Sequence, residues 1–329
     1  MAGDVLIYVE HENGRPKRIA LELASKAAEL AAVTGGSVAA VVLGPEARSA
    51  AGRLGAHGVD DLYISEDAAF DQYLTEPQVD ALAQVVADLE PATILFPYTP
   101  DGKDIAARLS ARLDSGLVTN VIGLSAEDGR LLAQETVFGG TYTTTVEVRD
   151  SRVAMYLVRP NAFPLRENRR ESTIHEIAYQ PREASQRARR GKKVQEEGAP
   201  VPLEEAGTIV SGGRGLGGPE PFGMLQELAN ALDGALGASR AAVDAGWISY
   251  EHQVGQTGRT VKPQLYVAIG ISGAVQHRVG MQTADTIVAI NRDSDAPIFQ
   301  LADLSVVGDL FQLVPALTEE VKKRKGDHR

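Results

Sequence analysis

The polar side chains with the clearest potential for chemistry follow a short apolar run near residue 265. Residues 265–269 are apolar and partly β-branched, which predicts a buried strand, and a Gly-Ile-Ser-Gly turn follows directly. A helix-compatible segment carrying Gln276 and His277 comes next. Unpaired N–H groups and the helix dipole attract anions at such a place, and hydroxyl, amide and imidazole groups could hydrogen-bond a heteroaromatic ring. The stretch therefore predicts a ligand-binding loop.

Similar junctions recur in the C-terminal half of the chain. Apolar runs end at Val210, Val243, Ile269 and Ile290, and a glycine-rich or polar segment follows each of them. In an open parallel sheet such junctions lie at the carboxyl edge, where ligands bind. The repetition indicates a binding site more strongly than any one of these loops.

The first of these loops contains a G-x-G-x-x-G pattern formed by Gly213, Gly215 and Gly218. The pattern occurs in dinucleotide-binding turns, but the acidic residue expected about 20 positions later is missing. A tight turn that needs positive φ explains the glycines equally well. Arg214 lies inside the pattern and could clamp a phosphate or carboxylate, although a solvated side chain would also suit such a turn.

Two further segments could contact the same ligand. Arg240 follows Ser239 and opens a run expected to be a short strand. This arginine could pair with Asp244, or it could lie beside an electron-rich ring and stabilise negative charge there. The polar loop QVGQT is either a solvated turn or a segment that presents Gln256 and Thr257 to the ligand.

His277 and Asp309 could each stabilise the fold rather than bind a ligand. A lone histidine more often caps or packs than does chemistry, and no second histidine stands at metal spacing, so a metal site is not expected. His277 could instead be a neutral or cationic donor to a ring carbonyl. Asp309 suits the N-cap of the last helix and could contact a ligand as well. Ser/His/Asp triads, carboxylate pairs and Walker A patterns do not occur in convincing contexts, which argues against hydrolysis and phosphoryl transfer.

Two α/β domains are expected to position these loops. Residues 1–115 alternate short apolar runs with amphipathic stretches, the pattern of βαβ units. Strands are expected at 5–9, 37–43, 62–64 and 93–96, and helices at 16–33, 45–55, 77–89 and from Asp101 or Gly102. Four runs between residues 117 and 158 alternate in a β-branched pattern and are separated by turn signals at 128–129, 139–140 and 150–151. They predict hairpin-like strands added to the same sheet.

The expected fold class is therefore α/β, with two domains that are each a mainly parallel sheet flanked by helices. A Rossmann-like domain with added β-hairpins spans 1–163, a linker spans 164–205, and the α/β domain with the ligand loops spans 206–329. A short alternation at 174–179 could add one strand. The basic segment 182–193 is expected to be solvated linker rather than an arm for nucleic acid.

The composition excludes several classes of function. Hydrophobic residues make up 43% and charged residues 23%, as in soluble globular proteins, and the apolar runs are too short to span a membrane. The net charge of −11 argues against binding to nucleic acid. The chain has no cysteine, which excludes disulfides, thiolate catalysis and Cys-ligated metals. The N-terminus shows no targeting segment, so a cytoplasmic location is expected.

Several longer stretches resemble the α subunit of electron transfer flavoprotein. In the second domain these are SRAAVDAGW, QVGQTGRTVKPQLYVAIGISGAVQHRVGM, TIVAINRDSDAPIFQLADLSVVGDL and VPALTE. In the first domain LFPYTPDGKDIAARLSARLDSGLVTNV and VRPNAF are similar to the same family. Lys103 stands where many relatives carry arginine, and Pro97-Tyr98 stand where a glycine is common. Both departures lie in the first domain and bear on partner docking.

The resemblance implies an electron carrier without substrate turnover of its own. It implies one FAD per heterodimer, bound in the second domain, and a β subunit that holds a structural AMP and packs on the first domain. Electrons would come from acyl-CoA and related dehydrogenases of fatty acid β-oxidation and pass to a membrane quinone oxidoreductase. Carried over by motif, the FAD contacts would be Arg214, Ser239, Arg240, Val254, Gly255, Gln256, Thr257, Ser272, Gly273, Ala274, Val275, Gln276, His277, Asn291, Asp309 and Leu310.

The resemblance also implies roles for some of these residues. Arg240 would lie against the isoalloxazine, Gln256 and Thr257 would address its N5/O4 edge, and His277 its O2 side. Cationic or donor groups there favour the reduced, anionic flavin and so raise its potential. Three alternatives stay open: a nicotinamide-dependent dehydrogenase using the turn at Gly213, an electron-bifurcating flavoprotein using NADH, and a nucleotide-binding regulatory module built on the first domain.

Overall fold

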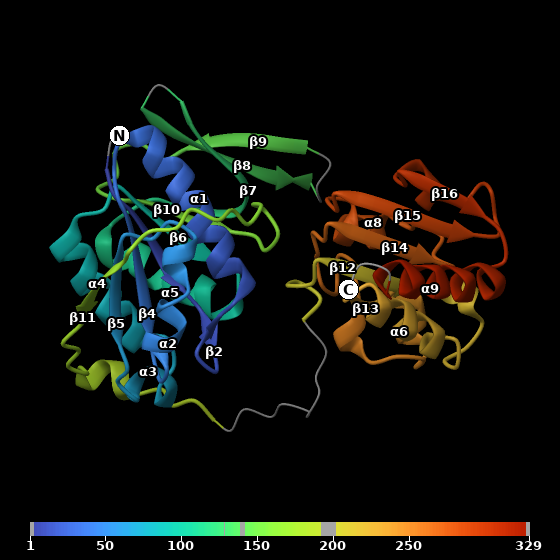
Figure 1. Cartoon of the computed structure of the whole chain (residues 1–329), viewed down its shortest axis with the longest axis horizontal. Coiled ribbons are helices and arrows are strands. Elements are labelled where there is room, and N and C mark those ends of the chain that lie inside the picture. Colours follow the sequence, from blue (N-terminus) through green and yellow to red (C-terminus); the bar gives the residue numbers. More distant parts are fainter. Residues whose placement is uncertain (1–2, 128, 139–141, 192–201, 327–329) are drawn as a thin grey trace. The chain divides into compact units, whose positions relative to one another are not determined.

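A computed structural model of the chain describes residues 3–127, 129–138, 142–191 and 202–326. The chain divides into two compact units (Figure 1): among the described residues, unit 1 holds 3–127, 129–137 and 142–191, and unit 2 holds 202–326. Each unit has a sheet and a hydrophobic core of its own. In the described part of the chain, no helix is both long and apolar enough to cross a bilayer.

Unit 1 is built on a nine-stranded sheet. In spatial order its strands are β11 (Thr173–Glu176), β5 (Asp61–Ser65), β4 (Val38–Leu43), β1 (Val5–Val9), β6 (Thr93–Pro97), β10 (Ala154–Val158), β7 (Leu117–Glu127), β8 (Arg130–Val137) and β9 (Tyr142–Glu147). The strands from β11 to β7 run parallel, whereas β8 and β9 are antiparallel. The strands β1, β4, β6 and β10 are buried along their whole length, as parallel strands covered on both faces must be.

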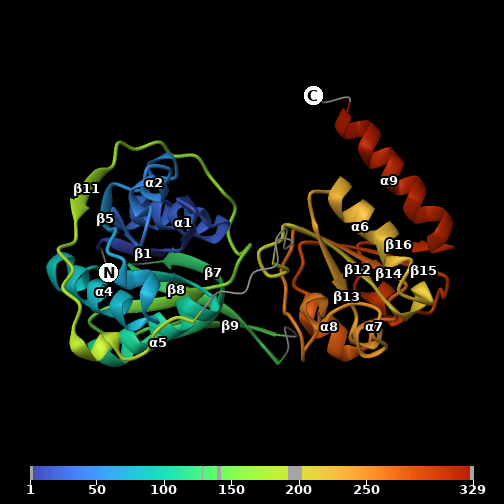
Figure 2. The ribbon, with the colours of Figure 1, turned by 90° about the horizontal axis from the view of Figure 1, so that it is seen from below.

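Helices cover both faces of this sheet, as Figure 2 shows. The helices of unit 1 are α1 (Arg18–Thr34), α2 (Ala47–Ala51), α3 (Ala69–Gln72), α4 (Glu76–Leu89) and α5 (Pro100–Leu113), with 3-10 turns η1 (Leu54–Ala56) and η3 (Glu183–Gln186) and a small hairpin of β2 (His11–Glu12) and β3 (Arg15–Pro16). Side chains alternate along β1: Ile7 packs with α1, and Leu6 packs with α4 and α5. Helix α5 begins at Pro100 behind Thr99, whose hydroxyl accepts from Gly102 N at 2.9 Å. The expected start at Asp101 or Gly102 was therefore slightly late.

The four expected strands between 117 and 158 are present, but they are not all hairpin strands. β7, β8 and β9 pair antiparallel in succession, as expected. β10 instead lies parallel between β6 and β7. Its five residues are all buried, so it gains more inside the sheet than at an edge. The turn expected at 139–140 and residue 128 of another expected turn lie outside the described residues.

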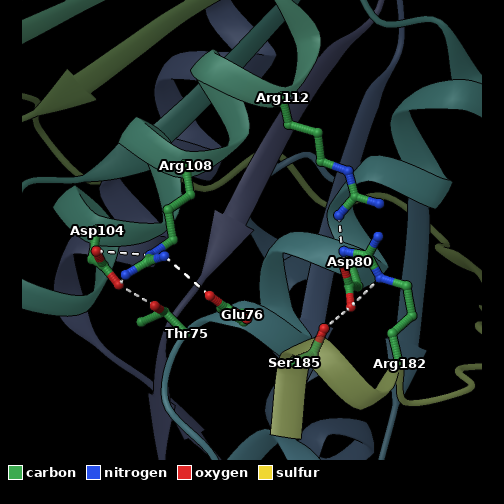
Figure 3. Close-up of polar contacts among 8 residues, drawn as sticks. All are labelled: Thr75, Glu76, Asp80, Asp104, Arg108, Arg112, Arg182 and Ser185. Carbon is green, nitrogen blue, oxygen red and sulfur yellow. Dashed lines mark hydrogen bonds and ion pairs between the residues drawn. The ribbon is translucent and has the colours of Figure 1, made fainter. Parts of the chain in front are cut away.

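The segment expected as a linker is partly folded onto unit 1. β11 pairs parallel with β5 and forms one edge of the sheet. The basic segment behind it is largely exposed, as expected, but it is pinned at Asp80 of α4, whose side chain is 8% exposed. Arg182 Nε donates to this carboxylate at 2.9 Å, and Ser185 and Arg112 also donate to it (Figure 3).

Several backbone contacts extend this attachment, so that residues 182–190 form what we call the strap. Leu74 N donates to Ala188 O at 2.9 Å, and Arg190 N donates to Gln72 O at 3.0 Å. Arg190 also pairs with Asp101 at 2.6 Å. Burial alone would raise the pKa of Asp80, but hydrogen bonds from Arg182, Ser185 and Arg112 outweigh it and lower the pKa. The expectation of a merely solvated linker is therefore wrong for the strap, and residues 192–193 lie outside the described part.

Unit 2 has a five-stranded sheet in the order β13-β12-β14-β15-β16. The strands are β13 (Ala235–Ala238), β12 (Thr208–Gly212), β14 (Leu265–Ile269), β15 (Thr286–Asn291) and β16 (Leu304–Val307), all parallel. The helices are α6 (Phe222–Ala231), α7 (Arg240–Asp244), α8 (Val275–Met281) and α9 (Leu310–Gly326), with 3-10 turns η4 (Arg214–Leu216), η5 (Tyr250–His252) and η6 (Pro297–Gln300). Helices α6 and α9 cover one face of the sheet, and α8 and η6 pack in the core of the other face.

One expected strand of unit 2 was wrong. Residues 240–244 form helix α7, and the strand is the preceding β13, which ends directly before Ser239. The sequence Ala-Leu-Gly-Ala of β13 has no β-branched residue, so it carries little strand signal. It becomes a strand because β12 offers it a buried parallel partner. The junction expected after Val243 therefore lies after Ala238.

Candidate functional site

The loops that follow the strands of unit 2 share the carboxyl edge of its sheet because all these strands are parallel. The chain passes from β12 to β13 on one side and to β14 on the other, so the strand order reverses between β12 and β14. In doubly wound sheets ligands bind at such a reversal. The turn after β12 carries Arg214, and the turn after β14 leads to α8 and His277.

The glycines of the G-x-G-x-x-G pattern serve the packing of these two turns on each other. Gly215 N donates to Gly270 O at 2.9 Å, and a Cβ on Gly213 would lie 2.4 Å from the same oxygen. The residue with positive φ is Gly217, which is not one of the three pattern glycines. Helix α6 begins only at Phe222, so the pattern does not open a helix as a dinucleotide fingerprint does.

The polar loop at 253–257 lies against α8. Gln256 N donates to Gln276 O at 2.8 Å, and a Cβ on Gly280 would lie 2.4 Å from the Gly255 backbone. Val254 N donates to Ala238 O at 2.9 Å, which ties the loop to the end of β13. The structure thus brings Val254, Gly255, Gln256 and Thr257 beside Gln276 and His277, although these segments are separate in the sequence.

The turn between β14 and α8 is held by contacts with later parts of the chain. Gly273 has φ +87, and a Cβ there would lie 2.4 Å from Ile298 N. Ser272 O accepts from Ile298 N at 3.0 Å, and Asn291 Nδ2 donates to Ile271 O at 2.9 Å. Ala274 stands at the N-cap of α8 and offers no side-chain cap, while Val275 is exposed. Asn291 therefore supports the turn from the end of β15.

His277 is a buried, neutral side chain. It is 6% exposed, and burial lowers its pKa to about 4, with a partial offset from the Val254 backbone. Its Nε2 lies 3.0 Å from the hydroxyl of Tyr266. Its Nδ1 is buried and makes no well-formed hydrogen bond among the described residues, although the Val254 backbone interacts with the ring. The cationic form considered from the sequence is therefore disfavoured at neutral pH, and the neutral donor is the form that the structure supports.

The other polar residues of the site differ in their surroundings. Arg214 is exposed, and Arg240, whose side chain is 61% exposed, pairs with Asp244 at 3.2 Å. Such an exposed pair contributes little to stability. The Ser239 hydroxyl is buried and, like Nδ1 of His277, has no hydrogen-bond partner in the described part of the chain. Asp309 accepts from Phe311 N at 3.0 Å, which confirms the expected N-cap of α9, and Leu310 behind it is buried.

Two of the buried polar atoms that have no hydrogen-bond partner in the described part of the chain, Ser239 Oγ and His277 Nδ1, lie at this edge, where a ligand could complete them. Buried polar groups in proteins are nearly always hydrogen-bonded. Ser239 Oγ and His277 Nδ1 depart from that rule on residues beside loops that carry exposed donors such as Arg214 and Gln276. These groups fit a ligand that combines ring heteroatoms with phosphates. The described residues contain no group of three His, Cys, Asp or Glu side chains suited to a metal ion.

Two models of known protein families match the chain. Residues 5–192 match the electron transfer flavoprotein domain, and residues 202–282 match the electron transfer flavoprotein FAD-binding domain. The chain belongs to the electron transfer flavoprotein α subunit family. The FAD-binding match covers the sequence-predicted contacts from Arg214 to His277, whereas Asn291, Asp309 and Leu310 lie beyond it.

The similarity to α subunits extends over nearly the whole chain. The electron transfer flavoprotein subunit alpha of Thermoanaerobacterium thermosaccharolyticum is 42% identical, with 98% of each chain covered. Its counterpart in Mycobacterium tuberculosis is also 42% identical, over 98% of this chain and 99% of that one. The subunit of Megasphaera elsdenii is 36% identical, over 98% and 97%. The chain is thus an electron transfer flavoprotein subunit, and neither the nicotinamide-dependent nor the bifurcating alternative is favoured by these findings.

One residue beside the site was missed in the sequence. Tyr266 was interpreted only as part of an apolar strand, yet its hydroxyl contacts His277. A tyrosine inside an otherwise aliphatic strand was the available signal, because a buried hydroxyl needs a partner.

Proposed function

We propose that the chain is the FAD-carrying subunit of a heterodimeric electron carrier. It pairs with a β subunit that holds AMP, takes electrons from acyl-CoA and related dehydrogenases in the cytoplasm, and passes them to a membrane quinone oxidoreductase. One FAD binds at the carboxyl edge of the unit 2 sheet. The observation that carries the proposal is the pair of unpartnered buried atoms, Ser239 Oγ and His277 Nδ1, within the segment that matches an FAD-binding domain.

Different side chains of unit 2 contact different parts of this cofactor. Arg214 neutralises phosphate charge, and Ser239 hydrogen-bonds a polar group of the cofactor. Gln256, Thr257 and His277 provide donors to the ring, and Arg240 places positive charge beside it. Bound FAD supplies reversible uptake of electrons. The residues of this chain bind, orient and tune the ring, and none of them acts as an acid, base or nucleophile on a substrate.

A visible spectrum tests this proposal. The chain is co-expressed and purified with its β subunit, and the complex is expected to show the two visible bands of oxidised flavin. Heat-released cofactor should be FAD by mass. The bands should bleach when a dehydrogenase and its acyl-CoA substrate are added under anaerobic conditions. A colourless complex that binds a nicotinamide nucleotide would contradict the proposal.

A matched pair of variants separates specific binding from general instability. Arg214→Ala should weaken FAD binding, because a phosphate partner is lost. Arg324→Ala removes an exposed arginine near the end of α9 that was not among the predicted contacts, and it should leave FAD binding unchanged.

A further inference from the structure

Tyr266 on β14 and His277 on α8 form a buried pair behind the site. Tyr266 is fully buried, its hydroxyl lies 3.0 Å from His277 Nε2, and the two ring centroids are 6.1 Å apart. The two residues are linked through the glycine turn after β14, so strand and helix hold the rings in fixed positions. This hydrogen bond decides which ring nitrogen of His277 carries the proton.

The chemistry of the two groups sets the direction of the hydrogen bond. A neutral imidazole has one donor nitrogen and one acceptor nitrogen. Burial raises the pKa of Tyr266, with a partial offset from the Ser211 hydroxyl, so the phenol keeps its proton. A phenol is a stronger acid than an imidazole N–H, and an imidazole nitrogen is a better acceptor than a phenol oxygen. Tyr266 therefore donates and Nε2 accepts, which leaves the ring proton of His277 on Nδ1.

With its proton on Nδ1, the imidazole could donate a hydrogen bond to a ligand. Nδ1 is buried and makes no well-formed hydrogen bond among the described residues, so the Val254 backbone, which interacts with the ring, does not satisfy it. A buried N–H without an acceptor is costly, and the cost is removed when a ligand oxygen meets it. An N–H that faces the cofactor stabilises negative charge on it, whereas a bare nitrogen lone pair would repel that charge.

We propose that Tyr266 is a positioning residue that acts through His277: its hydroxyl donates to Nε2 and holds the imidazole with its proton on Nδ1, ready to donate to the flavin. This inference rests on the proposed function, since it assumes that FAD occupies the carboxyl edge of unit 2. Because Tyr266 is fully buried, its hydroxyl would act on the flavin only through His277. Its effect is to raise the flavin potential by keeping a donor, rather than an acceptor, on Nδ1.

The test is a double-mutant cycle in the purified heterodimer with FAD bound. Tyr266→Phe keeps the ring and removes the hydroxyl, and we expect it to lower the midpoint potential of the flavin, with several-fold weaker binding of reduced relative to oxidised FAD. In a His277→Ala background the same substitution should cause no further shift. An unchanged potential in Tyr266→Phe, or an equal shift in both backgrounds, would overturn the proposal.

A matched control and a flavin-free measurement complete the test. Tyr156 is a buried tyrosine on β10 of unit 1, where burial raises its pKa to about 12, so Tyr156→Phe should leave the potential unchanged. If Tyr156→Phe shifts the potential equally, the effect is a general one and the proposal fails. In flavin-free protein the ¹⁵N spectrum of His277 should show the proton on Nδ1. A proton on Nε2 would overturn the inference about Tyr266, whereas a heterodimer without FAD would overturn the proposed function.

Discussion

His277 and Arg240, which are both proposed to donate to the cofactor, have very different surroundings. His277 is buried and neutral, and its Nε2 contacts the hydroxyl of Tyr266. Arg240 is largely exposed, carries a permanent charge and is restrained mainly by Asp244. A buried neutral donor acts over one hydrogen bond, whereas an exposed charge acts over a longer range and is screened by salt.

Because His277 is buried, unit 2 is expected to lose stability at acid pH. The unfolded chain has the ordinary pKa of 6.5, whereas burial lowers it to about 4 in the folded state. Above pH 6.5 the ring is neutral in both states. As the pH falls from 6.5 towards 4, the unfolded chain binds a proton that the folded state does not bind, so the free energy of unfolding falls by up to about 3 kcal/mol.

Urea titrations at several pH values measure this effect. The fluorescence of Trp247, the single tryptophan of the chain, reports on unit 2. Carboxylates also titrate in this range, so the relevant quantity is the difference between the wild-type chain and His277→Gln. This difference in the free energy of unfolding should change as the pH is lowered. If the stability of the two proteins fell in parallel with pH, the assignment would be contradicted.

At the scale of elements, the site depends on loops that approach each other closely through glycines. Gly280 of α8 is buried, and a Cβ there would lie 2.4 Å from the Gly255 backbone. Gly280→Ala should push the helix away from the 253–257 loop and lower the free energy of unfolding of unit 2 by about 1–3 kcal/mol. Gly223 of α6 is the matched control, since nothing lies within 4 Å of its Cβ position. Gly223→Ala should raise stability by about 0.5–1 kcal/mol in the same urea titration. Equal effects of the two substitutions would refute this account of the loop packing.

The strap is a second element whose attachment can be tested. Asp80 is its principal anchor, because it accepts from Arg182, Ser185 and Arg112. Asp80→Asn should weaken these contacts and open the strap, so trypsin should cleave after Arg187 several-fold faster, as followed by mass spectrometry. Asp88→Asn makes the same change at an exposed position of α4 and should leave the rate as in the wild type. An unchanged rate in Asp80→Asn would show that the backbone contacts alone hold the strap.

At the scale of the whole molecule, each unit has its own sheet and its own cores. A ligand that binds the folded form of one unit stabilises that unit by mass action, by about 2.7 kcal/mol at a hundredfold excess over its Kd. Added FAD should therefore raise the calorimetric transition that coincides with the Trp247 fluorescence change and leave the other transition in place. A shift of only the other transition would assign FAD to unit 1.

Much of the fold could be predicted from the sequence, because its strongest signals are local. The buried strands of unit 1 and the turn from β14 to α8 follow from apolar runs that end in glycine or polar residues. Strand β13 was not predicted because the sequence Ala-Leu-Gly-Ala has no strand preference of its own. The placement of β10 between β6 and β7 was not predicted either, because the pairing of strands far apart in the sequence has no local sequence signal.

The sequence by itself determined the α/β class, the family and the loops that we propose carry the site, because these depend on residue types and their spacing. Only the tertiary structure decided that His277 is neutral, that Tyr266 is its partner and that the glycines pack loop against loop. It also decided that the basic segment is strapped to Asp80. These features depend on burial and on contacts between distant residues, which no local pattern contains.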